Sequence, residues 1–201
     1  MTETNTRQEY IKGVVKFAAI FYGVILGISL LWIWLSENNF KFSFYHNSLK
    51  ILLVTVTIVI TTVGLSTWLA STFQWAHCLE AEFYKLFGSL DKKAFMLLAL
   101  FSGIGEEFLF RGAMQPAFGY VLTSLLFGCI HFIPNKAFLP WTVFAIIMGF
   151  VLGWLYMYSD NLLFPVFAHF LINYFNILGI CQRQKKYHDS AIEGESGMVD
   201  A

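Results

Sequence analysis

Charged residues are scarce in this sequence. Only 13% of its 201 residues are charged, whereas soluble domains carry roughly 25%. Hydrophobic residues make up 57% of the chain, and the formal net charge is zero. This composition excludes a disordered chain, a nucleic-acid-binding protein and an ordinary water-soluble enzyme. The three cysteines form neither a CxxC pair nor a disulfide framework, so we interpret them as small apolar residues within helices.

Six apolar segments account for most of the chain. They cover residues 17–35, 51–70, 94–116, 119–133, 137–158 and 162–180. About twenty apolar residues span a bilayer as a helix. The sequence therefore predicts an all-α, polytopic membrane helix bundle with about six transmembrane helices, forming one domain over residues 1–180. The fourth segment is short for a lipid-exposed helix, and we expect it to be enclosed by its neighbours or tilted.

A further segment, residues 73–87, is amphipathic. Apolar residues recur there at steps of three or four, while polar residues such as Glu80 and Lys85 occupy another face. The pattern predicts a helix lying in the membrane interface. The alternative is an extension of the second span that packs on the bundle. Residues 181–201 are polar and lack a core-forming pattern, so we expect a disordered tail.

Basic residues fall mainly on one side of the predicted membrane. With six spans, both termini share a side, and ten basic residues map to it: Arg7, Lys12, Lys16, Lys85, Lys92, Lys93, Lys136, Arg183, Lys185 and Lys186. Lys41 and Lys50 map to the opposite side. Cytoplasmic loops carry an excess of Lys and Arg. We therefore expect a multi-pass protein of the cell membrane, of bacterial inner-membrane type, with both termini cytoplasmic.

Strongly polar side chains within the spans are few and concentrated. An ionisable group inside a membrane is costly and is a functional candidate by default. The first two spans contain no such group, and we interpret them as scaffold. The remaining spans contain Glu106, Glu107, Arg111, His131, His169 and Asn173.

The spacing of these residues assigns them to helix faces. Glu107 and Arg111 are four residues apart, so they share a face and can form an ion pair. Glu106 points about 100° away from Glu107 around the helix and must face something else. His169 and Asn173 are also four residues apart, and both can donate hydrogen bonds to one atom beside their shared face.

Depth estimates bring these clusters together. Glu106 and His131 each lie about 12 residues from a tight turn near residues 116–120, hence roughly 18 Å below it. Asn173 lies about 12 residues beyond a second turn near Asp160, on the same membrane side, and reaches a similar depth. Three clusters that are distant in the sequence are therefore expected to converge.

Such a group of side chains suits the activation of water. A buried glutamate beside a histidine can hold a water molecule and take its proton. Two donors can stabilise the oxyanion that forms when water attacks a carbonyl. No HExxH motif and no serine in a GxSG-type setting opposite a base is present, which disfavours zincin-type and serine-type sites. Taken singly, each residue has a structural alternative, such as an ion pair or interhelical hydrogen bonding.

Three motifs carry a resemblance to a known family. The segments EEFLFR, FGCIH and HFLIN resemble, in this order, the EExxxR, FxxxH and HxxxN motifs of the CPBP family, also called the Abi family. This family includes the type II CAAX prenyl endopeptidases and bacterial immunity and bacteriocin-processing proteins. The resemblance covers residues 94–180. It implies a glutamate-type intramembrane endopeptidase that needs no metal or other cofactor.

The resemblance also implies roles for single residues. By position, Glu106 and His131 activate the water, while His169 and Asn173 form the oxyanion hole. Glu107 and Arg111 complete the first motif. The substrate implied is a membrane-associated peptide or protein segment within the lipid bilayer. A bacterial peptide or membrane protein fits this small chain better than a prenylated CAAX tail.

Two rival functions remain open at this stage. In a metalloenzyme, Glu106, His131 and His169 would bind zinc or a similar ion. In a non-catalytic bacteriocin self-immunity or scaffold protein, the same residues would be an inherited site without activity.

Overall fold

Every described element of the structure is helical. The computed structural model describes residues 3–36 and 48–199, with side chains from 4 to 36 and from 48 to 190. The elements are α1 (Glu3–Leu35), α2 (Ser48–Thr72), α3 (Gln74–Phe87), α4 (Lys92–Glu107), the π-helix η1 (Phe108–Met114), α5 (Gln115–Phe118), α6 (Tyr120–Ile130), the 3-10 helix η2 (Lys136–Phe138), α7 (Leu139–Ser159) and α8 (Leu163–Val199). No strand occurs in these ranges, which confirms the predicted all-α class.

Four helical stretches are long and apolar enough to cross a membrane. They are α1, α2, η2 with α7, and α8 as far as Ser190. The other two predicted spans form the unbroken succession α4, η1 and α5, and the short α6. The 11 residues of α6 rise only about 16 Å, against a hydrocarbon core of about 30 Å. The fourth segment is therefore short, as predicted, and its helix ends at Ile130.

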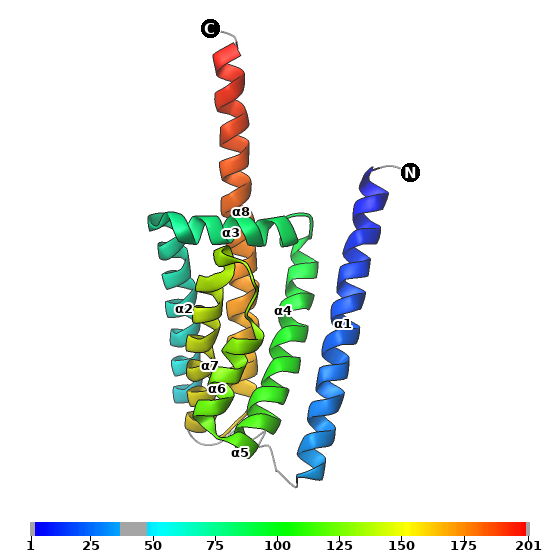
Figure 1. The fold of residues 1–201 in the computed structure, drawn as a ribbon, viewed down its shortest axis with the longest axis vertical. Coiled ribbons are helices and arrows are strands. Elements are labelled where there is room, and N and C mark those ends of the chain that lie inside the picture. The colour runs from blue at the N-terminus through cyan, green and yellow to red at the C-terminus, as the bar shows by residue number, and fades with distance from the viewer. Residues whose placement is uncertain (1–2, 37–47, 200–201) are drawn as a thin grey trace.

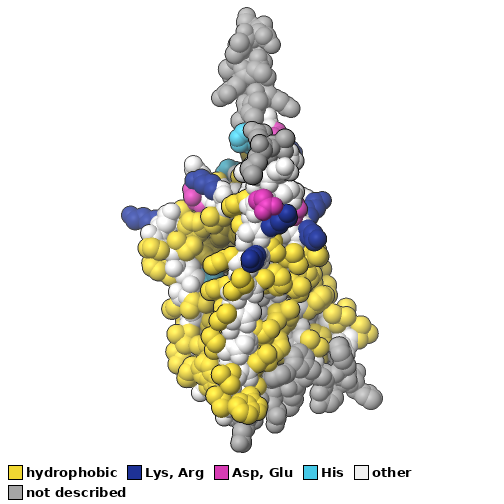
Figure 2. Space-filling model, turned by 90° about the vertical axis from the view of Figure 1, so that its right-hand side faces the viewer, with side chains coloured by type: hydrophobic (Ala, Val, Ile, Leu, Met, Phe, Trp, Pro, Cys, Tyr) yellow, Lys and Arg dark blue, Asp and Glu magenta, His cyan; other side chains and the backbone are white. Residues whose placement is uncertain are grey.

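The outer surface of the bundle is apolar. Phe17, Trp34, Leu53 and Ile60 are each more than half exposed, and Figure 2 shows hydrophobic side chains over most of the visible face of the bundle. Soluble proteins rarely expose apolar surface on this scale. The surface is therefore suited to contact with lipid, and the chain is a membrane protein.

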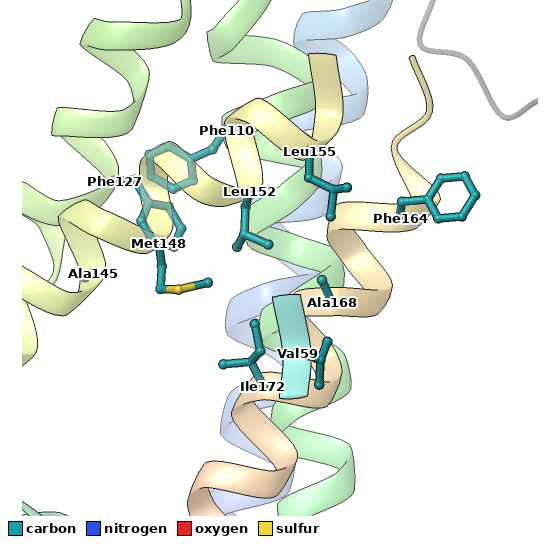
Figure 3. Close-up of a cluster of buried hydrophobic side chains, with 10 residues drawn as sticks. All are labelled: Val59, Phe110, Phe127, Ala145, Met148, Leu152, Leu155, Phe164, Ala168 and Ile172. Carbon is teal, nitrogen blue, oxygen red and sulfur yellow. The ribbon is translucent and has the colours of Figure 1, made fainter. Parts of the chain in front are cut away.

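A buried apolar core holds the motif-bearing helices in place. Figure 3 shows its ten residues, which come from α2, η1, α6, α7 and α8. Phe110 of η1 meets Phe127 of α6 edge to face, with ring centroids 4.9 Å apart. Ala168 of α8 is fully buried in the same core. Since Phe127 lies one turn before His131 and Ala168 directly precedes His169, this packing fixes the positions of both histidines.

Two tight turns set the depth of the motif residues. Gly119 joins α5 to α6 with a φ of 82°, a conformation that glycine adopts without steric cost. Asp160 ends α7 in the left-handed region, with a φ of 49°. Both turns lie at the end of the bundle opposite α3 (Figure 1). They agree with the turns that the sequence predicts near residues 116–120 and 160.

The helices α6 and α7 approach each other closely at Gly149. A Cβ atom at this position would lie 2.5 Å from the backbone oxygen of Ser124, so a larger residue would force the helices apart. Small residues allow such close approach between membrane helices. The close contact also brings the Gly149 carbonyl within reach of polar side chains in the interior.

The amphipathic segment forms α3, as predicted. Figure 1 shows α3 lying across one end of the bundle, at a steep angle to the other helices. The chain turns after Thr72, so α3 does not extend the line of α2. Ala76 and Glu80 are buried on its inner face. This arrangement is that of a helix parallel to a membrane surface.

The predicted disordered tail needs a correction. In the structure α8 continues past residue 180 to Val199. Arg183 forms a two-pronged contact with Glu80 of α3 and reaches Thr67 Oγ1 of α2 at 3.4 Å. Gln184 is buried as well. The polar composition of this segment predicted disorder. Composition alone could not show that Arg183 pairs with Glu80 of another helix.

Basic residues gather at the end of the bundle that α3 covers. The start of α1 and the end of α8 both lie there (Figure 1), and Figure 2 shows several Lys and Arg side chains close to the projecting part of α8. Of the two residues predicted for the opposite side, Lys50 lies in the first turn of α2. Lys41 lies outside the described residues.

Candidate active site

The six predicted site residues meet in the interior of the bundle. They come from segments that are distant in the sequence. In chain order they are Glu106 and Glu107 of α4, Arg111 of η1, His131 at the C-cap of α6, and His169 and Asn173 of α8.

The helix that carries the first motif changes its winding at the site. It begins at the N-cap Asp91, whose side chain accepts a hydrogen bond from the backbone N–H of Ala94 at 2.8 Å. It is α-helical to Glu107 and then π-helical over η1. π-helical turns are rare and occur often at functional sites. Here the wider turn carries the fully buried Arg111.

Glu107 is the centre of a sealed polar cluster. Its Oε1 accepts hydrogen bonds from Arg111 Nη1 at 2.9 Å and from His169 Nδ1 at 2.7 Å. Arg111 Nη2 donates in turn to the Gly149 carbonyl at 3.0 Å. Glu107 and Arg111 have no exposed surface. The predicted pairing is therefore observed, and the cluster also ties η1 to α7 and α4 to α8.

Phe127 separates the sealed cluster from the histidine at the end of α6. The Arg111 guanidinium carbon lies 4.6 Å from its ring centroid, within the range of a cation–π contact. The His131 ring lies on another side, with centroids 4.8 Å apart. Phe127 therefore combines packing in the apolar core with an electrostatic contact to Arg111.

Glu106 points away from this cluster. Its Oε1 accepts a hydrogen bond from the Tyr22 hydroxyl at 3.1 Å. Its Oε2 lies 3.7 Å from His131 Nε2 and 3.9 Å from His169 Nε2. Within the described residues, this buried oxygen has no hydrogen-bond partner. Two histidines from different helices thus direct their outer nitrogen atoms toward one carboxylate oxygen.

The tautomer of His131 follows from its other contact. Its Nδ1 lies 2.6 Å from the backbone oxygen of Phe127. A carbonyl oxygen can only accept, so Nδ1 carries the proton. In a neutral ring Nε2 then presents a lone pair toward Glu106. The helix α6 ends at Ile130, so His131 is its C-cap residue. At this position the Phe127 carbonyl is free to accept the hydrogen bond from the His131 ring.

Asn173 of α8 lines the same cavity as Glu106. Its Nδ2 donates a hydrogen bond to Ser102 Oγ of α4 at 3.0 Å. A carboxamide nitrogen has two hydrogen atoms. One hydrogen atom is donated to Ser102. The second remains available, and the contact with Ser102 fixes the direction in which it points. Ser102 lies one helical turn before Glu106 on α4, so the contact ties Asn173 of the third motif to the helix that carries the first.

A cavity of about 290 Å³ gives access to these side chains. Its walls are mainly aromatic and aliphatic, with residues from α1, α3, α4, α6, α7 and α8. The polar side chains of Glu106, His131, His169 and Asn173 lie on its surface. Phe83 and Phe87 of α3 line it as well, because α3 crosses this end of the bundle. Glu107 and Arg111 do not line the cavity.

The sequence analysis missed Tyr22 and Ser102. Tyr22 comes from α1, which we interpreted as scaffold because it contains no strongly ionisable group. The structure adds to the scaffold interpretation of α1 a direct contact with the site, because the Tyr22 hydroxyl donates a hydrogen bond to Glu106. The position of Tyr22 in the middle of an apolar span could have indicated a hydrogen-bonding role for its hydroxyl. Ser102 gave no comparable signal, because a small hydroxyl residue is common in membrane helices.

The structure also bears on metal binding. Among the described residues, no group of three or more His, Cys, Asp or Glu side chains is arranged to hold a metal ion.

Comparisons with known proteins find a family that resembles the part of the chain that carries this site. Residues 91–175 match the family model for type II CAAX prenyl endopeptidase Rce1-like proteins. The uncharacterized protein YpbD of Bacillus subtilis (strain 168) is 33% identical over 96 residues, an alignment that covers 43% of this chain and 49% of YpbD. The matched part thus spans about half the length of that relative. No solved structure matches the chain. Residues 91–175, which contain all six predicted site residues, are therefore similar to the Rce1-like family of type II CAAX prenyl endopeptidases.

Proposed function

We propose that this protein is a glutamate-type intramembrane endopeptidase. It hydrolyses a peptide bond of a membrane-associated substrate with a water molecule activated by Glu106 and His131. The observation that carries the proposal is the environment of Glu106 Oε2. This oxygen is buried beside the cavity and lies 3.7 and 3.9 Å from two histidine nitrogens. A water molecule off the line between these atoms would be within hydrogen-bond reach of all three.

His131 is suited to act as the base together with Glu106. Its Nδ1–H donates to a backbone carbonyl, so the lone pair on Nε2 faces the cavity. A base must lie within hydrogen-bond reach of the proton that it takes, directly or through one water. The carboxylate of Glu106 orients the same water. The proton that leaves the water is held between the two groups and then passes to the departing amine.

His169 and Asn173 supply the oxyanion donors in this proposal. His169 Nδ1 faces the carboxylate of Glu107, so the other nitrogen can donate only when the ring is protonated. Charge balance favours that state. Glu106 and Glu107 are two anions and Arg111 is one cation, so a protonated His169 brings the formal charge of the site to zero. Asn173 contributes the second hydrogen of its Nδ2.

The substrate is a peptide segment with apolar side chains. The cavity walls are mainly aromatic and aliphatic. Most of the polar side chains on them belong to the group around Glu106, and Asn176 is a further one. The cavity extends to α3, at the end of the bundle where basic side chains gather. Basic residues favour the cytoplasmic side. We therefore assign this end, and both termini, to the cytoplasm, and expect substrates to enter there or from the adjacent lipid.

The test compares membrane proteomes from cells that carry the wild-type protein or Glu106→Gln. Peptides with new termini should appear with the wild-type protein and with the control variant Glu82→Gln, but not with Glu106→Gln. Glu82→Gln is the matched control, because this glutamate lies on α3, pairs with Lys85 and does not line the cavity. Identical peptide termini in all three samples at equal expression would reject the protease and favour the non-catalytic immunity or scaffold function.

A metal-dependent membrane hydrolase is the second candidate. It is suggested by the approach of His131 Nε2 and His169 Nε2 to one Glu106 oxygen, at 3.7 and 3.9 Å, although the described side chains are not arranged as a metal site. Exhaustive chelation separates the candidates: we expect cleavage to survive it. Loss of cleavage that added zinc restores would establish the metalloenzyme instead.

A further inference from the structure

Asn176 of α8 is a polar cavity residue outside the hydrogen-bonded network around Glu106. It lines the cavity together with His169 and Asn173. These three residues are spaced i, i+4 and i+7, so they follow one face of α8. Asn176 is about 4.5 Å further along the helix axis than Asn173, in the direction of α3. Its neighbours on the wall in that direction, Ile177 and Ile180, are apolar.

One end of the Asn176 side chain is fixed by another helix. Ser66 Oγ of α2 donates a hydrogen bond to Asn176 Oδ1 at 2.7 Å. The same hydroxyl also lies 3.0 Å from the Val63 carbonyl of its own helix, but its single proton is directed to the nearer acceptor, Asn176 Oδ1. The contact therefore serves to orient Asn176. With Oδ1 held against α2, Nδ2 is the free end of the carboxamide, and within the described residues no partner of Nδ2 is recorded.

We propose that Asn176 is a substrate-binding residue, whose Nδ2 donates a hydrogen bond to a backbone carbonyl of the peptide near the scissile bond. The inference rests on the proposed function, because it assumes that a peptide occupies the cavity. An amide donor in apolar surroundings is costly unless it finds an acceptor. A peptide brings such acceptors at every residue, whatever its side chains.

The spacing supports two contacts to one peptide. Side chains at i and i+3 of a helix have Cβ atoms roughly 5–6 Å apart. Carbonyl groups on one side of an extended peptide are roughly 7 Å apart. Asn173 and Asn176 can thus contact two carbonyls of the same extended segment. Asn173 addresses the reacting carbonyl, and Asn176 holds a neighbouring one that does not change during the reaction.

The test measures binding without cleavage. The probe is N-acetyl-Leu-Leu-Leu-amide, which is apolar and offers only backbone polar groups. Its dissociation constant is measured by calorimetry in detergent, with the Glu106→Gln protein as the parent so that no hydrolysis occurs. Adding Asn176→Leu should weaken binding roughly 3–10-fold, the usual range for one lost hydrogen bond.

Three further variants make the result specific. Asn176→Asp keeps the acceptor for Ser66 but loses the donor, and it should weaken binding at least as much as leucine does. Ser66→Ala frees the carboxamide and should weaken binding by a smaller factor. Phe175→Leu, on the exposed face of α8, should leave the dissociation constant unchanged.

Two results would overturn the inference. One is a dissociation constant for Asn176→Leu or Asn176→Asp equal to that of the parent; the other is no binding of the probe by the parent itself. Because hydrolysis plays no part, the outcome is independent of the proteome comparison. A bound peptide without cleavage by the wild-type protein would reject only the proposed protease, and cleavage with an indifferent Asn176 would reject only this site.

Discussion

Glu106 and Glu107 are neighbours in the sequence but belong to two different regions of the molecule. Glu107 lies in a sealed region with Arg111, where its Oε1 accepts two hydrogen bonds and no side-chain surface is exposed. Glu106 lies at the cavity, where one oxygen is held by Tyr22 and the other faces two histidine nitrogens. The rotation of about 100° between consecutive helical residues separates these environments.

The difference shows how one helix can combine structure and chemistry. The sealed region joins several helices through Glu107 Oε1, which accepts hydrogen bonds from Arg111 and His169, while Glu107 Oε2 is enclosed without a hydrogen-bond partner among the described residues. The cavity region keeps a carboxylate oxygen available. His169 belongs to both, since Nδ1 contacts Glu107 and Nε2 points toward Glu106. A change on the sealed side can therefore reach the cavity through the orientation of one imidazole.

The sharpest test of this comparison replaces each glutamate by glutamine. Glu106→Gln should lower the cleavage rate by about 10²–10⁴, because it removes a group that handles a proton. Its thermal unfolding in detergent should stay close to that of the wild-type protein. Glu107→Gln should instead lower the free energy of unfolding by about 3–5 kcal/mol, because it leaves Arg111 buried without its counter-charge. Equal effects of the two substitutions on stability would remove the distinction between the regions.

Arg111→Ala tests the sealed region from its other partner. We expect a loss of about 3–5 kcal/mol in unfolding free energy, since Glu107 is left buried without its guanidinium partner. Arg183→Ala is the comparison, because Arg183 also pairs with a glutamate but retains 24% side-chain exposure. Arg183→Ala should lower the free energy of unfolding by clearly less than Arg111→Ala does. An unchanged unfolding midpoint for Arg111→Ala would mean that the pair has no structural role.

Asn173→Ala tests the cavity region. Loss of one oxyanion donor typically lowers the turnover rate by about 10²–10³. Substrate binding should change little, because the contact forms mainly in the transition state. The readout is kcat and KM for a peptide that spans an identified cleavage site. Ser102→Ala, which removes the hydrogen-bond partner of Asn173, should have a smaller effect in the same direction. Full activity of Asn173→Ala would return Asn173 to a role in helix packing.

Tyr22→Phe gives the smallest expected effect. It removes one hydrogen bond to Glu106 and should lower kcat/KM roughly 3–10-fold, as expected for a net contribution of about 0.5–1.5 kcal/mol. Ile20→Leu, on the exposed side of α1, is the matched control and should be neutral. If Tyr22→Phe is as active as the wild-type protein, the contact of α1 with the site is structural only.

Several features of this molecule could be predicted because they depend on local sequence. Apolar runs of sufficient length predict the helices, and Gly119 and Asp160 mark the turns. The four-residue spacing of Glu107 and Arg111 predicts their pair, since helical geometry brings such residues together. The two turns also predict the convergence in depth of the three motifs. The roles assigned to the six residues stay predictions until the variants above are measured.

Other features depend on contacts across the bundle, and the sequence did not predict them. Tyr22 reaches Glu106 from 84 residues away, and Ser66 reaches Asn176 from 110 residues away. Arg183 finds Glu80 across 103 residues, which makes the start of the expected tail part of the fold. The π-helical winding around Arg111 has no local sequence signal that we could identify.

The sequence by itself determined the class, the membrane environment, the helices and the spacing of the motif residues along them. Each of these follows from hydropathy and helical periodicity, which act within one segment. Only the tertiary structure decided which polar atom meets which: a free oxygen on Glu106, a sealed Glu107, a His131 held by a carbonyl and an Asn176 held by Ser66. The physical reason is that hydrogen bonds act over about 3 Å, so they depend on how helices pack and not on the order of residues within them.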